Sequence, residues 1–526
     1  MSDYIIIGAG SGGAVLANRL TFDSQVSVTV VEAGGWDKSP WIHMPAGYFR
    51  LMQTLELDWG YWTVPQTHVN NRKMLIPRAK SVGGCTTVNG MIYTRGHRTD
   101  YDHWAELGNR GWNYDSVLPY FKKAEGWQGG GVTSIHGADG PLKTSRSQLS
   151  SPISTAWLEA GQQAGYPYND DLNRGEQEGV GPCDGTLADG VRSSVSRCYI
   201  TPVKHRKNLS VITRAMVTRI LMRAGRAVGI EYVEGGQKKT LMADKEVILC
   251  GGTFNSPHLL QLSGIGDPGH LRKVGIKVEH DLPGVGRNLQ DHVGCGLKVR
   301  ITKPYSVLKY LRLHRQLLGV MQYFTTGAGA AAAHGVEVMA FLKTRPDLIA
   351  PDVQWHINNV MYNDHGREII WEEGFMPYFN LSRPQSRGTV LARSADPADL
   401  PSLDPQFFSV ADDLRVMRDA LRMSREIVAQ KAFDDFRGEE YAPGKQATSD
   451  RDLNEYIKDN CNSVYHPVGT CKMGSDAMAV VDDRLRVRGI DGLRVVDASI
   501  MPTLTSGNTN APTIMIGEKA ADMILN

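Results

Sequence analysis

The sequence has few cysteines, no long hydrophobic run and almost no excess of charge of one sign. Its seven cysteines are scattered over 526 residues, which argues against a disulfide framework and favours a reducing compartment. The 58 basic and 56 acidic residues leave a formal net charge of +2. No basic stretch is long enough to predict binding to nucleic acid or to an anionic membrane surface.

Signals for export or membrane insertion are also missing. The uncharged tract at residues 327–336 is rich in Ala and Gly, too short and too weakly apolar to cross a bilayer. Residues 1–3 carry no basic segment before the strand-like run that begins at Tyr4, so no secretory signal is expected. We expect a cytoplasmic protein of two or more structural units with no membrane span, and peripheral membrane association stays open.

The first 32 residues predict a strand, a glycine turn, a helix and a second strand that ends in an acidic residue. The turn contains Gly8-x-Gly10-x-x-Gly13, followed 19 residues later by Glu32. In this context the glycines allow a tight turn and close approach of a pyrophosphate to a helix N-terminus, and the carboxylate accepts from ribose hydroxyls. The pattern predicts a dinucleotide site, NAD or FAD, made by Gly8, Gly10, Ser11, Gly12, Gly13, Glu32 and Ala33.

Further blocks resemble the glucose–methanol–choline (GMC) oxidoreductases. Residues 78–93 resemble the first signature of that family and residues 252–266 the second, while His466-Pro467-Val468-Gly469-Thr470 and residues 507–513 look like its C-terminal catalytic blocks. The order is that of the family and covers essentially the whole chain, closest to its choline- and alcohol-dehydrogenase-like branch. The resemblance implies an α/β fold: a Rossmann-like FAD-binding domain and a discontinuous substrate-binding domain with an antiparallel sheet flanked by helices.

The same resemblance implies how the chain is divided and where FAD binds. We assign residues 1–150, 191–300 and 456–526 to the FAD-binding domain, and 151–190 and 301–455 to the substrate-binding domain. Val88 occupies the position at which some relatives have a histidine that links FAD covalently, so we expect non-covalent FAD. The further cofactor residues that the resemblance implies are Arg78, Gly83, Gly84, Thr86, Asn89, Gly90, Met91, Val217, Gly251, Asp497, Ala498, Asn508, Pro512 and Thr513.

The catalytic assignment follows from the chemistry of alcohol oxidation. A hydride leaves an alcohol carbon readily only when a base accepts the hydroxyl proton, and histidine suits that task near neutral pH. The resemblance makes His466 the base and Asn510 its partner, with the N-terminus of the last helix near the flavin pyrimidine. Val464 and Tyr465 are expected to shape the substrate pocket, with weaker indications for His334, Glu337, His356 and Tyr362.

The predicted function is oxidation of a primary alcohol to the aldehyde, with hydride transfer to flavin N5. A quinone, a carrier or oxygen would reoxidise the flavin, and we favour a dehydrogenase over a peroxide-forming oxidase. A flavin-containing hydroxynitrile lyase and a nicotinamide dehydrogenase are the alternatives. No metal site is expected, because Cys461, His466 and Cys471 lack a fourth ligand nearby. The sequence predicts neither the alcohol nor the oligomeric state.

Overall fold

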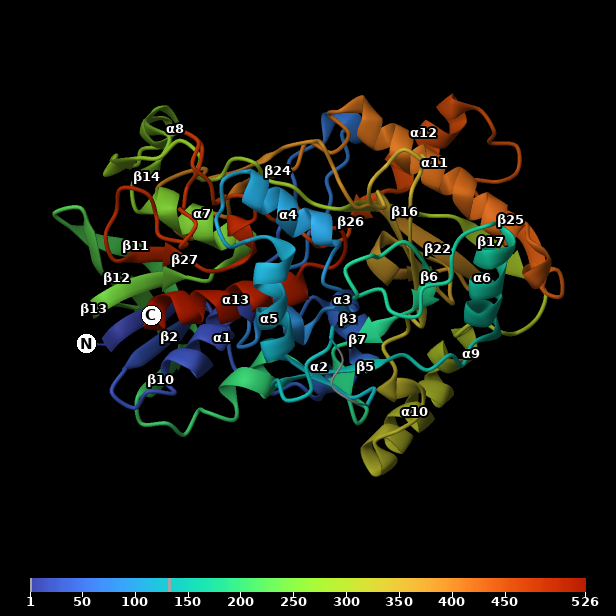
Figure 1. Ribbon diagram of the computed structural model, residues 1–526, viewed down its shortest axis with the longest axis horizontal. Coiled ribbons are helices and arrows are strands. Elements are labelled where there is room, and N and C mark those ends of the chain that lie inside the picture. The colour runs from blue at the N-terminus through green and yellow to red at the C-terminus, as the bar shows by residue number, and fades with distance from the viewer. Residues whose placement is uncertain (1, 131–133) are drawn as a thin grey trace.

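The computed structural model describes residues 2–130 and 134–526 and contains two main sheets (Figure 1). The first has the strand order β10-β2-β1-β13-β12-β11, and β27 pairs with β13. Strands β10, β2, β1, β13 and β27 run parallel, while β11 and β12 extend the sheet as antiparallel strands. Their bounds are β1 Ser2–Ile7, β2 Val28–Glu32, β10 Leu209–Thr213, β11 Ala215–Arg223, β12 Arg226–Glu234, β13 Gln237–Leu249 and β27 Leu493–Val495.

Two helices from opposite ends of the chain pack beside this sheet. Helix α1 (Ser11–Leu20) contacts α13 (Asn510–Leu525), which also packs on α5 (Tyr114–Ala124). Arg19 of α1 pairs with the fully buried Glu518 of α13 at 2.7 Å. The predicted strand–turn–helix–strand opening is therefore present, and the closing helix lies along the helix that follows the glycine turn (Figure 1).

The second sheet is antiparallel, in the order β25-β17-β22-β19-β18-β6, and β16 joins it with β26 at its end. Helices α6 (Pro152–Gln163), α11 (Ala411–Val428) and α12 (Asp450–Asn460) contribute to the core on which it packs. Trp355 on β19 is fully buried and donates to the Ser424 hydroxyl at 2.8 Å. The strand bounds are β6 Gly179–Pro182, β16 Val293–Gly296, β17 Lys298–Ile301, β18 Val338–Leu342, β19 Val353–Asn358, β22 Gly374–Leu381, β25 Arg437–Ala442 and β26 Asn462–Ser463.

The expected α/β fold with an antiparallel second sheet is confirmed, but two of its expected boundaries are wrong. Strands β16 and β17 belong to the second sheet, so the chain enters it before Val293 rather than after residue 300. At the other end β26 pairs with β16, so the chain leaves the second sheet after Ser463 rather than at 455. Short buried strands join the two units at both places, and no change in composition marks them.

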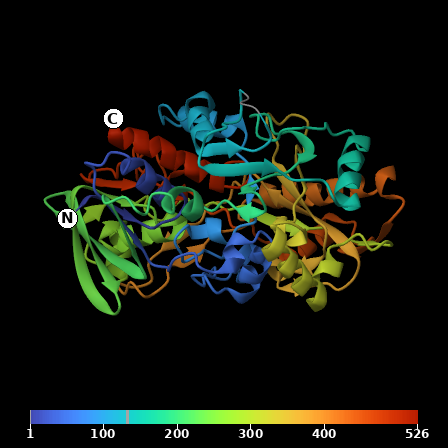
Figure 2. The same cartoon turned by 90° about the horizontal axis from the view of Figure 1, so that it is seen from below.

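Helices α9 (Leu308–Leu311) and α10 (Leu313–Thr326) project from the second unit (Figures 1 and 2). No helix among the described residues is both long and apolar enough to span a membrane. Other elements are α2 Pro40–His43, α3 Gly47–Thr54, β3 Ile92–Tyr93, α4 Arg98–Glu106, β4 Glu125–Trp127, β5 Leu142–Arg146, β7 Asp184–Gly185, β8 Leu187–Ala188, β9 Val191–Arg192, α7 Gly252–Leu262, β14 Ile265–Gly266, α8 Pro268–Lys273, β15 His280–Asp281, β20 Tyr362–Asn363, β21 Glu368–Ile369, β23 Thr389–Leu391 and β24 Ser402–Asp404.

Candidate active site

A cavity of about 760 Å³ is lined by residues of both units. Its wall includes the glycine turn before α1, the segment after Pro77, the start of α7 and the loops on either side of β27. These are the chain segments in which the sequence places the cofactor and catalytic residues. The fold therefore brings the widely separated motifs to one enclosed space.

The glycines of the first turn let strand, helix and loops approach closely. A Cβ on Gly12 would lie 2.0 Å from the Val496 carbonyl oxygen. A Cβ on Gly84 would lie 2.8 Å from the Cα of Gly10, so the turn and the later loop meet without side chains between them. Gly8, Gly10, Ser11 and Gly12 line the cavity, whereas the predicted contact Gly13 does not, because it packs on the Gly8 carbonyl behind the turn.

Glu32 lies at the end of β2, as expected for a ribose-binding carboxylate. Its oxygens accept from the backbone N–H groups of Ala9 at 2.9 Å and Gly34 at 2.7 Å, and burial raises the pKa of this side chain. Each carboxylate oxygen can accept more than one hydrogen bond, so acceptor capacity toward the cavity is left. Ala33, Val217 and Gly251 also line the cavity.

The loop after Pro77 contributes Arg78, Gly84, Asn89, Gly90 and Met91 to the wall, together with Cys85 and Val88. Two of its predicted contacts do not reach the cavity. The Thr86 hydroxyl donates to the Gly83 carbonyl at 2.6 Å and accepts from the Val195 N–H at 3.1 Å. Thr86 and Gly83 therefore shape the loop from behind.

The sequence analysis missed Arg192, which holds this loop. Its guanidinium donates to the Asn89 carbonyl and side-chain oxygens at 2.7 Å each and to the Ile42 carbonyl at 2.8 Å. Arg192 is fully buried, has no carboxylate partner among the described residues, and burial lowers its pKa to about 9. Nothing in the local sequence marks it, because it lies about a hundred residues from the loop it supports.

Helices α1 and α13 both begin at the cavity, and neither has a side-chain cap. The Ser11 hydroxyl donates to the Asn510 side-chain oxygen at 2.9 Å and joins the two ends. Uncapped N-termini present unpaired N–H groups and partial positive charge, which suits a pyrophosphate and an electron-accepting ring. Together with the glycine cradle and Glu32, this donor set fits FAD. Thr513 lines the cavity, whereas Pro512 faces away from it.

Asp497 and Ala498 lie at the cavity, but the carboxylate of Asp497 is already engaged. One oxygen accepts from the Gly252 N–H at 2.8 Å and from the Ser256 hydroxyl, and the other from the Ser499 N–H at 2.8 Å. Asp497 therefore fixes the start of α7 against the loop after β27. Its side chain therefore holds this part of the cavity wall in place.

The partner of His466 is Asn508, and the expected pairing with Asn510 is wrong. The Asn508 amide lies 3.1 Å from His466 Nε2, while Asn510, two residues on, bonds Ser11. Asn510 is the first residue of α13 and Asn508 directly precedes the N-cap Thr509, and the two amides reach different partners. Asn508, Val464 and Tyr465 line the cavity with His466.

A chain of hydrogen bonds fixes which nitrogen of His466 carries the proton. His292 Nε2 lies 3.1 Å from the Ser382 carbonyl, which can only accept, so this nitrogen is an N–H. Burial lowers the pKa of His292 to about 3 and keeps it neutral. Its Nδ1 therefore accepts from His466 Nδ1 at 2.9 Å, which leaves the lone pair of His466 on Nε2.

The other side of the imidazole agrees with that assignment. The Gln354 amide donates to the Asn508 side-chain oxygen at 3.1 Å, which directs the Asn508 N–H toward His466 Nε2. Burial, the neighbouring histidines and Arg78 hold the pKa of His466 well below its usual range. At neutral pH its Nε2 is an unprotonated acceptor at the cavity wall.

Asp291 holds the loop that carries the base. It accepts from the His466 backbone N–H at 2.8 Å and from the Ser463 hydroxyl, and burial raises its pKa to about 7. Tyr465 has a φ of +68°, a left-handed conformation that turns the chain between Val464 and His466. The Tyr465 hydroxyl in turn bonds His365.

Two weaker predictions for the substrate pocket fail. Glu337 faces away and accepts from Ser150 and Ser151 at the start of α6, and His334 bonds the Ser147 hydroxyl at 2.7 Å. Side chains alternate along an extended chain, and it is the neighbouring Val336 that lines the cavity. His356 and Tyr362 do line it.

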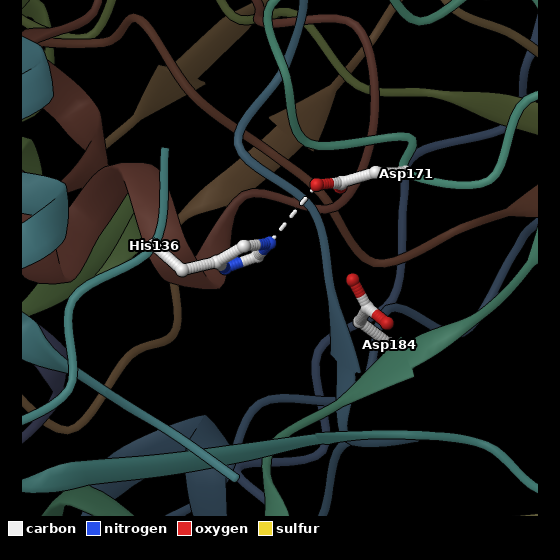
Figure 3. A group of neighbouring side chains, drawn as sticks. All are labelled: His136, Asp171 and Asp184. Carbon is white, nitrogen blue, oxygen red and sulfur yellow. Dashed lines mark hydrogen bonds and ion pairs between the residues drawn. The ribbon is translucent and has the colours of Figure 1, made fainter. Parts of the chain in front are cut away.

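A second cluster is made by His136, Asp171 and Asp184 (Figure 3), none of which lines the cavity. Both ring nitrogens of His136 bond carboxylates, Asp171 and Glu125, at 3.0 Å each. Asp184 accepts from Arg146 at 2.9 Å. Burial alone would lower the pKa of His136, but its carboxylate partners raise it to about 9. A protonated imidazole has no lone pair for a metal, so this is a buried ion-pair cluster.

Comparison with known proteins identifies the family. The GMC oxidoreductase family models match residues 2–294 at the N-terminal side and 384–517 at the C-terminal side. The chain belongs to the GMC oxidoreductases. It is 43% identical over 526 residues to a protein of Sinorhizobium fredii named oxygen-dependent choline dehydrogenase, covering 100% of this chain and 95% of that one. A protein of the same name from Chromohalobacter salexigens is 42% identical over 99% of this chain and 94% of that one.

Solved GMC structures share the whole fold. Pyridoxine 4-oxidase from Mesorbium loti superposes with a TM-score of 0.91 at 31% identity, covering 99% of each chain. Formate oxidase of Aspergillus oryzae gives a TM-score of 0.94 at 27% identity, covering 99% of this chain and 98% of that one. This GMC oxidoreductase is thus an FAD-dependent enzyme that oxidises alcohols.

Proposed function

We propose that this GMC oxidoreductase oxidises an uncharged primary alcohol to the aldehyde, with His466 as the base. The observation that carries the proposal is the hydrogen-bond chain from Ser382 through His292 to His466, which leaves an unprotonated Nε2 at the wall of the cofactor cavity. Bound FAD supplies the hydride acceptor. The protein residues bind and orient the alcohol and move its proton.

When the alcohol hydroxyl takes the place of the Asn508 N–H at His466 Nε2, this nitrogen accepts the hydroxyl proton. The resulting negative charge on the alcohol oxygen weakens the neighbouring C–H bond. The imidazolium that forms keeps its Nδ1–H on His292. Asn508, 3.1 Å from Nε2, can donate an amide N–H to the alcohol oxygen while charge develops there. Because burial keeps His466 unprotonated at neutral pH, we expect the base to be active there and to be lost when acid protonates this side chain.

The residues that would hold FAD without a covalent bond are on the same wall. Gly10, Gly12 and the uncapped start of α1 suit the pyrophosphate, Glu32 the ribose, and the start of α13 the electron-accepting ring. Val88 lines the cavity and offers no nucleophile. For reoxidation we keep a quinone or a carrier as the preferred acceptor, as in the sequence analysis, and oxygen as the alternative, which the name of the oxygen-dependent relatives favours.

An uncharged alcohol is favoured by the charges at the cavity. Buried Lys298 lines it, bonds Asn363 and forms no ion pair with a described carboxylate. Of the carboxylates in the same part of the wall, Asp364 is engaged with Arg367 at 2.6 Å, and Glu368 acts electrostatically on Lys298. Tyr48, Tyr362 and Tyr378 add aromatic faces and hydroxyls. A quaternary ammonium such as the choline of the named relatives would meet the Lys298 charge.

The test is anaerobic bleaching of the bound flavin by a panel of aliphatic, benzylic, furanic, polyol and amino alcohols. We expect His466→Ala to keep its FAD and to slow bleaching by about a hundred- to ten-thousandfold. His280→Ala, outside the cavity wall, is the matched control. Unchanged bleaching in His466→Ala would disprove the base, and flavin that stays oxidised with every alcohol would disprove alcohol oxidation. Faster bleaching by choline than by uncharged alcohols would contradict the proposed substrate class.

A further inference from the structure

Helix α10 and the short helix α9 before it expose an unusual number of large hydrophobic side chains. Of the sixteen such exposed residues in the described chain, six lie within residues 310–324. Leu313, Leu317, Met321 and Phe324 follow one another at the spacing of a single helix face and are 74%, 59%, 63% and 61% exposed. With Tyr310 and Leu318 they form what we call the outer stripe, defined by Tyr310, Leu313, Leu317, Leu318, Met321 and Phe324.

A single buried side chain attaches α10 to the rest of the protein. Tyr323 is buried against Met44, and Val320 packs in the same small cluster. The side chains that a helix shows to water are normally polar, but the outer stripe of α10 is apolar and exposed. A contiguous exposed apolar patch on a folded protein marks a surface that binds something.

The charged residues in the stretch of chain that carries the outer stripe are all of one sign. The sequence contains no Asp or Glu between Asp291 and Glu337. Lys309, Arg312 and Arg315 are exposed, and none pairs with a carboxylate of the described chain. Hydrophobic side chains flanked by cations on a surface helix are the combination that lies in the headgroup region of an anionic bilayer.

We propose that α10 docks this enzyme on the surface of an anionic phospholipid membrane, with the outer stripe inserted among the acyl chains. The helix projects at the edge of the molecule in both views, where a flat surface can reach it (Figures 1 and 2). A second copy of the chain is a poorer occupant, because a symmetric pairing would offer the same cations and no carboxylate. The sequence analysis missed this surface because the basic residues are few and only the fold shows that the apolar ones are exposed.

The docking does not depend on which alcohol the cavity takes. It is tested with the FAD-loaded enzyme and sedimenting vesicles of equal parts phosphatidylcholine and phosphatidylglycerol, compared with phosphatidylcholine alone. We expect wild type to bind the anionic vesicles and to be released by high salt. The triple variant Leu317→Gln/Met321→Gln/Phe324→Gln should bind at least about tenfold more weakly. Arg312→Gln/Arg315→Gln should lose about fivefold for each charge removed.

Matched controls make the same kinds of substitution on the unit that contains the parallel sheet. They are Phe22→Gln, which replaces a side chain that is 85% exposed, and Lys204→Gln/Lys207→Gln. These variants should bind vesicles as wild type does, and all variants should keep their flavin absorbance and soluble-acceptor activity. Wild type that stays in the supernatant, or a triple variant that sediments with it equally, would overturn the proposal. A third outcome would also overturn it: light scattering shows that wild type is a dimer and the triple variant a monomer, and wild type does not bind vesicles. The outer stripe would then join two copies of the chain.

Discussion

Replacing His292 tests whether the hydrogen-bond chain sets the reactivity of the base. In His292→Leu the side chain that accepts from His466 Nδ1 at 2.9 Å is lost, while the volume of the buried site is roughly kept. Because His292 is fully buried, no bulk water replaces it as the acceptor. Without this acceptor the buried Nδ1–H of His466 is unpaired, which destabilises the present arrangement of the imidazole. The ring can then turn, or its proton can move to Nε2, and either change removes the Nε2 lone pair from the cavity.

The size of the effect follows from the unpaired donor. A buried N–H without an acceptor costs about 1–3 kcal/mol, and each 1.36 kcal/mol in the barrier is a factor of ten in rate. We therefore expect the anaerobic bleaching rate at saturating alcohol to fall about 5- to 150-fold in His292→Leu. Flavin content and the alcohol concentration for half-maximal rate should change little, because His292 does not line the cavity.

The matched variant is His292→Asn, whose side-chain oxygen can take the place of Nδ1 as the acceptor. It should recover most of the bleaching rate although it loses the bond to the Ser382 carbonyl at 3.1 Å. Equal rates for wild type and His292→Leu at equal flavin content would refute the reasoning. Equal losses in the Leu and Asn variants would show that the site tolerates no substitution and that the acceptor is not the cause.

Three further predictions follow from single contacts. Glu32→Ala should lower the FAD retained per protein after gel filtration, because it removes the buried acceptor at the end of β2, whereas Glu32→Gln should retain more. Asn508→Ala should slow flavin bleaching while keeping FAD, because Asn508 contacts His466. Asn510→Ala should lower the FAD retained while leaving the bleaching rate per bound flavin nearly unchanged, because Asn510 bonds Ser11. The unfolding free energy should fall by about 3 kcal/mol as pH rises from 6.5 through 9, the pKa of His136, and His136→Gln should abolish that slope in denaturant titrations.

The sign of the pH effect is set by the folded state. The pKa of His136 is raised above its unfolded value of about 6.5, so its contribution is complete below that pH and is lost as pH passes about 9. A flat stability between pH 6.5 and 9 would contradict the ion-pair cluster. Flavin retention equal to wild type in Glu32→Ala would count against its ribose role, and identical behaviour of the two asparagine variants would contradict their separate contacts.

The fold was predictable because its decisive signals are local. The run into Gly8-x-Gly10-x-x-Gly13 and the carboxylate of Glu32 describe one strand–turn–helix–strand unit whose geometry allows few alternatives. The antiparallel second sheet was expected from resemblance rather than from periodicity. Its edges were misplaced, because β16 and β26 are short strands whose partners lie about 170 residues apart.

The site was less predictable where contacts depend on long-range geometry. The motif that contains Asn508 and Asn510 offers two identical amides, and only the start of α13 decides that one reaches His466 and the other Ser11. His292 carries no signal as a partner of His466, 174 residues away. Arg192 was missed for the same reason, since its loop contacts are set by tertiary packing.

The two amides also connect cofactor binding with catalysis. Asn510 joins the start of α13 to Ser11 at the start of α1. Asn508, two residues earlier, holds the imidazole of His466. Both helix ends carry unpaired N–H groups at the cavity, so an anionic ligand there draws them together. Because only Thr509 separates Asn508 from Asn510, one short segment both joins the two helix ends and orients the base, so the cofactor cradle and the catalytic histidine share a support.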